Sequence, residues 1–190
     1  IQTDDITITS DNHSFEIYCK ITATDADARI FDSSHLLFQL FRNSSSSEFG
    51  TWLQNSGSHT GGTIVNGEWT HLVVSMTSNT FNIYQDKSSI MSGSYGYSIP
   101  ATYPFYIGRQ RGSSNMRMNG NVKYFRIFNK TLSTTDVTTL YDNREDSTFG
   151  FSPMTIPGTV ISASTKPKLN KEGNKLTILS EQHFDDLSGN

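Results

Sequence analysis

The sequence predicts an all-β protein: an antiparallel β-sandwich of the jelly-roll type with one short C-terminal helix. Three observations predict it. The hydrophobic fraction is only 34%, whereas aromatic residues reach 12%, which is typical of a thin sandwich whose strands bury one face and whose few large rings fill the core. Residues 15–21 alternate apolar and polar side chains. Residues 66–86 read as a turn, a strand, a second turn and a returning strand.

The first strands are predicted by alternation. Ile6 and Ile8 alternate with threonines, and a cleaner pattern follows in residues 15–21. The side chains expected in the core are Phe15, Ile17, Cys19 and Ile21, and those expected to be more exposed are Glu16, Tyr18 and Lys20. Cys19 is the only cysteine, so no intrachain disulfide forms, and its place among apolar residues favours a small core residue over a reactive thiol.

Four segments follow before the central hairpin. Residues 29–31 form a short predicted strand. Residues 36–41 are nearly all apolar, which indicates a central strand covered on both faces. Residues 49–54 form a strand that carries Trp52. Residues 55–62 are Gly, Ser, His and Thr, with Asn55 at their start, and we expect a loop or turn there.

The central hairpin begins at Asn66-Gly67, a dipeptide that tolerates positive φ and favours a turn. Residues 69–76 then form a strand, with Leu72, Val74 and Met76 spaced by two. The polar residues 77–80 reverse the chain, and residues 81–86 return with Phe81 and Ile83 on one face.

The chain after the hairpin carries two predicted strands. Pro100 and Pro104 are expected to interrupt the chain before a strand at residues 105–109. Residues 110–119 form a polar loop. Residues 120–128 form a long strand whose expected faces are Val122, Tyr124 and Phe128 on one side and Lys123, Phe125 and Ile127 on the other.

The predicted helix follows this strand. Ser133 can be its N-cap, and Asp136 stands three residues later in the place of a capping-box acid. Leu132 and Val137 have the spacing of a hydrophobic staple. Val137, Leu140 and Tyr141 form one short apolar face, and the helix is expected to end at residues 142–143.

The order of these motifs resembles a known family. A turn, Trp69-x-His71, a strand, Tyr84-x-Asp86 and then a Tyr-Ile-Gly strand are similar to the laminin-G-like domains of the concanavalin A-like lectin/glucanase superfamily, as is the segment of residues 120–141. Lys87 departs from the family pattern, which usually has Gly there. The resemblance implies a laminin-G-like, jelly-roll sandwich over residues 1–143.

Residues 144–190 are predicted to be a C-terminal extension or linker with prolines at positions 153 and 157. Two interpretations remain open. The segment is the start of a further β domain, or it folds back onto the sandwich. In the second case, residues 159–184 dock on an exposed sheet edge, where unpaired N–H and C=O groups accept a partner strand.

Charge and missing motifs argue against several functions. The net charge of −3 provides no basic stripe for nucleic acid, and no run of 18 apolar residues predicts membrane insertion. The chain has no Glu-x-Asp-x-x-Glu pair, no Gly-x-Ser-x-Gly elbow and no zinc-ligand spacing. We therefore expect no enzyme, and we expect His71 to be a packed strand residue.

Calcium is the one cofactor that the resemblance suggests, because laminin-G-like domains often hold Ca²⁺ at the rim of the sandwich. Asp25 and Asp27 share a loop and Asp32 follows closely, and Ca²⁺ binds several hard oxygens from such loops. Solvated loop carboxylates are the alternative interpretation.

Sugar recognition in this superfamily uses rim loops, with an aromatic ring on the pyranose and polar side chains on its hydroxyls. The candidate ligand-binding residues by loop position are Tyr95, Tyr97, Arg109, Arg111, Asn115 and Arg117. Ordinary packing is the alternative for each tyrosine, and the arginines also suit a carboxylate, a sulfate or a protein.

These observations predict a non-catalytic, lectin-like or adhesion module that binds a glycan or a surface protein. It would belong to a longer multidomain chain that is extracellular or exposed on a cell or virion surface. The alternative is a structural or assembly domain of a particle or fibre. A glycoside hydrolase is less well supported, because it requires two carboxylates roughly 5 to 10 Å apart in a cleft.

Overall fold

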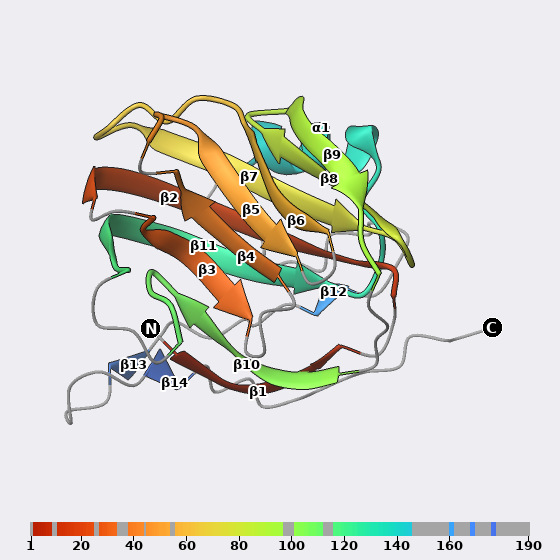
Figure 1. The fold of residues 1–190 in the computed structure, drawn as a ribbon. Helices are drawn as coiled ribbons and strands as arrows, with labels where there is room; N and C mark the ends of the chain where they lie inside the picture. Colours follow the sequence, from red (N-terminus) through yellow and green to blue (C-terminus); the bar gives the residue numbers. More distant parts are fainter. Residues whose placement is uncertain are drawn as a thin grey trace.

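Two antiparallel six-stranded sheets pack face to face (Figure 1). This computed structural model describes residues 2–8, 11–24, 27–33, 38–43, 45–53, 56–96, 101–111 and 116–145, and the short strands 160–161, 168–169 and 176–177. The predicted antiparallel sandwich with one short helix is confirmed.

The first sheet has the order β1-β10-β3-β4-β5-β6. Its strands are β1 (Gln2–Ile8), β10 (Ala101–Ile107), β3 (Arg29–Ser33), β4 (Phe38–Arg42), β5 (Phe49–Leu53) and β6 (Gly57–Gly61). The second sheet has the order β12-β11-β2-β7-β8-β9. Its strands are β12 (Val160–Ile161), β11 (Met118–Phe128), β2 (His13–Thr24), β7 (Trp69–Met76), β8 (Thr80–Gln85) and β9 (Ser88–Ser94).

The main core lies between the sheets and is rich in phenylalanine. The four residues of β2 that alternation assigned to the core are all buried, namely Phe15, Ile17, Cys19 and Ile21. The ring of Phe15 lies 5.4 Å from the rings of both Phe31 and Phe105, in the tilted geometry that aromatic pairs prefer. Burial raises the pKa of the Cys19 thiol to about 12, so this residue is a core side chain and not a reactive thiolate.

The expected exposure of the other face of β2 was wrong for two residues. Glu16 is 0% exposed and Tyr18 is 4% exposed, although the strand register is as predicted. The reason is a second layer on the outer face of this sheet. There the helix α1 (Thr134–Asp142) buries Val137 and Leu140 together with Val73, Tyr84, Phe128 and Leu132.

The helix begins as the sequence predicts. The Asp136 backbone N–H donates to the Ser133 hydroxyl at 3.2 Å, and the Ser133 backbone N–H donates to the Asp136 carboxylate at 2.8 Å. This is a complete capping box, in which a shorter acid takes the usual place of glutamate. Leu132 and Val137 both lie in the outer apolar cluster, and Asn143 is the C-cap.

Replacing Ser133 with alanine is expected to lower the free energy of unfolding by about 1 kcal/mol, because the N-cap hydroxyl no longer accepts the Asp136 N–H. Urea denaturation measures this loss, with Thr134→Ala, an exposed neighbouring change, as the control. Equal stability of Ser133→Ala and the wild type would show that another group caps the helix.

A β-bulge corrects the predicted faces of β11. Val122 pairs with Cys19, but Tyr124 pairs with Tyr18, so Lys123 is an extra residue in this strand. Val122 therefore packs against the main core with Phe125 and not on the face of Tyr124. Alternation alone places Val122 with Tyr124, because a period of two assumes that no residue is inserted.

Two further predictions were wrong at sheet positions. Gly57–Gly61, predicted as a loop, form the edge strand β6, whose side chains are mostly exposed. Pro104, predicted to interrupt the chain, lies inside β10 opposite Asp5. The register of β1 shifts between Gln2 and Asp5, so the irregularity lies where the missing proline N–H would interrupt a regular ladder.

Part of the C-terminal extension joins the sandwich. Val160 and Ile161 of β12 pair antiparallel with Phe128 and Ile127 at the edge of the second sheet. The strands β13 (Lys168–Leu169) and β14 (Leu176–Thr177) pair with each other. Residues 160–161 thus lie on a sheet edge, whereas the docking of residues 159–184 as a whole and the place of residues 144–190 in this or a further domain stay predictions. Apart from β12, β13 and β14, residues 146–190 lie outside the described residues.

Candidate functional site

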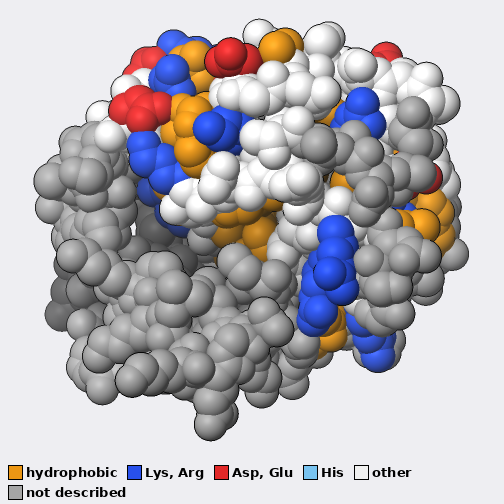
Figure 2. Space-filling model, turned by 90° about the vertical axis from the view of Figure 1, so that its left-hand side faces the viewer, with side chains coloured by type: hydrophobic (Ala, Val, Ile, Leu, Met, Phe, Trp, Pro, Cys, Tyr) orange, Lys and Arg blue, Asp and Glu red, His pale blue; other side chains and the backbone are white. Residues whose placement is uncertain are grey.

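Four arginines meet at the rim of the sandwich where β10 ends and β3 and β11 begin. We call Arg29, Arg109, Arg111 and Arg117 the arginine rim. Backbone bridges join Arg117 to both Arg29 and Arg109, and the Met118 N–H donates to the Gly108 carbonyl at 2.9 Å. Figure 2 faces this end of the molecule, and Lys and Arg side chains are spread over its described part with fewer Asp and Glu beside them.

The arginines of the rim differ in how their side chains are held. Arg29 is buried, donates to the Asp27 carbonyl at 2.7 Å and lies over the Phe41 ring. Arg109 lies over the Tyr106 ring. Arg111 and Arg117 are exposed. The rim therefore presents two solvent-accessible guanidinium groups on a backbone fixed by hydrogen bonds.

Asp32, the third predicted calcium ligand, lies beside the rim. It is buried, and its Oδ2 accepts the Arg111 backbone N–H at 2.9 Å. Burial raises the pKa of Asp32, although this N–H, Gln39 and the charges of Arg29 and Arg111 act in the opposite direction. Ca²⁺ needs several hard oxygens, whereas here one carboxylate oxygen is already bonded and two guanidinium groups lie near.

The other predicted calcium ligands lie in the loop before β3. Asp27 is partly buried, and Asp25 lies outside the described residues. In the described part of the chain, no three His, Cys, Asp or Glu side chains come together as a metal site. Calcium binding by Asp25, Asp27 and Asp32 stays a prediction.

Of the three remaining predicted ligand-binding residues, the structure describes Tyr95. Tyr95 is 6% exposed, its ring lies in the main core and its hydroxyl donates to the Thr77 carbonyl. Its ring is therefore a packing group and offers no face to a sugar, which corrects its assignment as a stacking residue. Tyr97 and Asn115 lie outside the described residues.

The sequence did not reveal a buried ionic cluster on the outer face of the second sheet. Glu16 Oε1 lies 2.7 Å from His71 Nε2, and Arg126 Nη2 donates to the same oxygen at 2.9 Å. The side chains of Glu16 and His71 are 0% and 1% exposed. The rings of Tyr141 and Tyr18 lie 5.8 and 6.4 Å from the His71 ring. His71 is thus a packed strand residue as predicted. No pattern in the neighbouring sequence indicates that Glu16 is its partner.

The buried acids of the described residues do not form a catalytic pair. Glu16 lies on the outer face of the second sheet and is bonded to Arg126 and His71. Asp32 lies on the other sheet, where it accepts the Arg111 N–H. The main core separates them, whereas most glycoside hydrolases use two carboxyl groups that flank one cleft.

Comparisons with known proteins agree with this architecture. Residues 1–138 match a family model described as the concanavalin A-like lectin/glucanases superfamily. A comparison with curated proteins gave no match. Within the described residues, no helix has the length and apolar character needed to cross a membrane.

Solved structures share the fold at low sequence identity. A SAP-like pentraxin from Limulus polyphemus is 16% identical with a TM-score of 0.58, covering 71% of this chain and 72% of the pentraxin. A Trypanosoma rangeli sialidase is 14% identical with a TM-score of 0.61, covering 71% of this chain and 23% of the sialidase. A candidate carbohydrate binding protein from Bacteroides ovatus is 10% identical with a TM-score of 0.57, covering 70% and 41%. The chain thus spans less than a quarter of the sialidase.

Proposed function

This chain belongs to the concanavalin A-like lectin/glucanase superfamily, and from that premise we propose that it is a non-catalytic module that binds acidic glycans at the arginine rim. The superfamily contains enzymes as well as binding proteins, as the sialidase and pentraxin structures illustrate. Membership therefore leaves the activity open, and the proposal depends on the residues of this chain.

One observation carries the proposal: the fold brings Arg111 and Arg117 together as exposed cations in a chain whose net charge is −3. Guanidinium groups bind carboxylate and sulfate in a bidentate geometry. Arg29 and Arg109 of the same rim lie over the aromatic rings of Phe41 and Tyr106. The site thus suits a sugar that carries a carboxylate or a sulfate group.

Two findings support binding without catalysis. The two buried acids of the described residues lie on different sheets, so neither provides a partner for the other across a cleft. Solved structures that share this fold include a pentraxin and a candidate carbohydrate binding protein. We propose that the module belongs to a longer, surface-exposed chain, where its partner is a glycan or a surface protein.

The test is a glycan array and a titration with the wild type and the double variant Arg111→Ala/Arg117→Ala. Affinity for sulfated and carboxylated glycans should fall about tenfold or more for each arginine removed, because a hydrogen bond to a charged group contributes about 1.5–3 kcal/mol. Added salt should also lower the affinity of the wild type for these glycans, because it screens the attraction between exposed charges.

The control is Lys87→Ala/Lys123→Ala, which removes the same charge elsewhere on the surface. These lysines pair with the exposed carboxylates of Asp142 and Glu145. If the control loses as much affinity as the arginine variant, only net charge matters and the rim is not the site. Equal binding by the arginine variant and the wild type would reject the proposal.

A further inference from the structure

A groove of about 420 Å³ lies on the outer face of the second sheet, beside the segment that precedes α1, and its lining combines polar groups with apolar residues such as Phe81 and Leu132. Its polar lining consists mainly of Ser75, Thr77, Asn82, Tyr84, Ser92 and Thr131. No charged side chain of the described residues lines it. The volume lies within the range of small-ligand sites, roughly 300–1,000 Å³.

The floor of the groove is a polar row that runs across four strands. Ser14 pairs with Ser75, Ser75 with Asn82, and Asn82 with Ser92, so these side chains occupy one face of the sheet. Ser14 and Ser75 are buried, Asn82 is half-buried and Ser92 is exposed. The row therefore passes from beneath the segment before α1 into the open groove.

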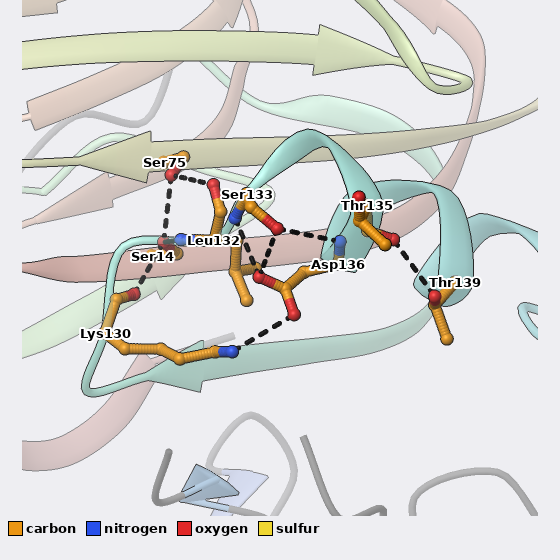
Figure 3. Close-up of polar contacts among 8 residues, drawn as sticks. All are labelled: Ser14, Ser75, Lys130, Leu132, Ser133, Thr135, Asp136 and Thr139. Atoms are coloured by element: carbon orange, nitrogen blue, oxygen red, sulfur yellow. Dashed lines mark hydrogen bonds and ion pairs between the residues drawn. The ribbon is translucent and has the colours of Figure 1, made fainter. Parts of the chain in front are cut away.

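One wall of the groove is fixed by the buried end of this row. The Ser14 hydroxyl donates to the Lys130 carbonyl at 2.8 Å and accepts the Leu132 N–H at 3.0 Å, and the Ser75 hydroxyl donates to the Leu132 carbonyl at 2.7 Å. Figure 3 shows that these bonds hold Leu132, the residue directly before Ser133, which forms the capping box with Asp136. A wall held in this way is ordered before a ligand arrives, which reduces the entropy lost on binding.

Asn82 lines the groove, and its side-chain amide keeps a donor and an acceptor that are not used within the described part of the protein. Its Nδ2 donates to the Tyr84 hydroxyl at 3.0 Å, and its Oδ1 accepts the Ser89 hydroxyl at 2.7 Å. The Tyr84 ring is packed in the outer apolar cluster, so its hydroxyl is a fixed partner. An asparagine amide has two donors and two lone pairs, which leaves one donor and one acceptor for a ligand.

We propose that this groove is a binding site for a neutral saccharide, separate from the arginine rim. Each sugar hydroxyl both donates and accepts, so two neighbouring hydroxyls match the remaining donor and acceptor of Asn82. The Ser92 hydroxyl is a further partner, and the Thr131 hydroxyl, which donates to the Met76 carbonyl at 2.5 Å, is a further acceptor. A carboxylate or sulfate would find no cation here. The inference does not rest on acidic-glycan binding, because the two sites use different segments of the chain.

The test is an NMR titration of the ¹⁵N-labelled full chain with glucose, galactose, mannose and their β-linked disaccharides. Amide shifts should cluster in residues 80–84, 91–93 and 131–132, stay absent from residues 109–111 and be insensitive to added salt. Asn82→Ala should weaken binding about tenfold, because the remaining donor and acceptor of its amide are lost. Ser92→Tyr, which fills the groove from an exposed position, should abolish it. Asn121→Ala, an exposed asparagine of β11, is the matched control.

Three results would overturn the proposal: no sugar of the panel shifts the groove amides, the shifts fall elsewhere, or folded Asn82→Ala and Ser92→Tyr titrate like the wild type. A thermal melt of each variant confirms folding, and Ser92→Tyr decides alone if Asn82→Ala unfolds. The variant Arg111→Ala/Arg117→Ala should keep neutral-sugar binding. Failure of one site is therefore distinguishable from failure of the other.

Discussion

Replacing Glu16 with alanine is expected to lower the free energy of unfolding by about 3–5 kcal/mol, because removing one partner leaves a buried charge uncompensated. The charge left behind is that of Arg126, whose side chain is only 12% exposed. His71 Nε2 loses its partner as well. Urea denaturation with circular dichroism measures the loss.

The control for this prediction is Glu68→Ala, which removes an exposed glutamate from the loop before β7 and should change stability by less than about 0.5 kcal/mol. A double-mutant cycle of Glu16→Ala and Arg126→Ala should show that the two losses are not additive. Stability of Glu16→Ala within about 1 kcal/mol of the wild type, below the value for a broken buried pair, would contradict the cluster.

Replacing Gly120 with alanine is the second change expected to destabilise the protein strongly. Its φ is 156°, and a Cβ atom there would lie 1.9 Å from the Lys20 carbonyl oxygen of the neighbouring strand. Backbone strain of this kind costs about 1–3 kcal/mol, and the clash with backbone adds to it. Because β2 and β11 must separate to make room, the melting temperature should fall clearly.

The matched control is Gly57→Ala. Gly57 also has a positive φ, of 79°, but an added Cβ would meet nothing within 4 Å. It therefore carries backbone strain without a clash, and the difference between the two variants isolates the close approach of β2 and β11. Equal losses in the two variants would show that the approach of the strands does not matter.

The sequence predicted the features of the fold that depend on neighbouring residues. The helix N-terminus followed from Ser133 and Asp136, whose hydrogen bonds span three residues. The core face of β2 followed from strict alternation around Ile17. In both cases the signal and the structure that it specifies lie within one segment of the chain.

Predictions failed where distant segments decide the environment. Glu16 is buried because Arg126 and His71, far away in the sequence, meet it under the outer layer. Val122 lies on the opposite face of β11 from the one predicted, because a bulge inserts a residue that alternation does not show. The edge strand β6 lacks an apolar side to mark it, because its side chains are mostly exposed. For the candidate site, Arg111 and Arg117 were found by their polar loop, whereas Arg29 at the start of β3 was not found and the groove at Asn82 joins separate strands.

The strand order has a consequence for how the chain folds. The meanders β3-β4-β5-β6 and β7-β8-β9 join neighbours in sequence, but β2 pairs with β11, and the contact between Glu16 and Arg126 spans 110 residues. Long-range pairing of this kind is slow, because loop closure must precede the contacts that stabilise it. During synthesis, β2 leaves the ribosome well before its partner β11 has been made. One edge of β2 is open during that interval, which makes it the place where a prolonged pause would lead to pairing with the wrong strand.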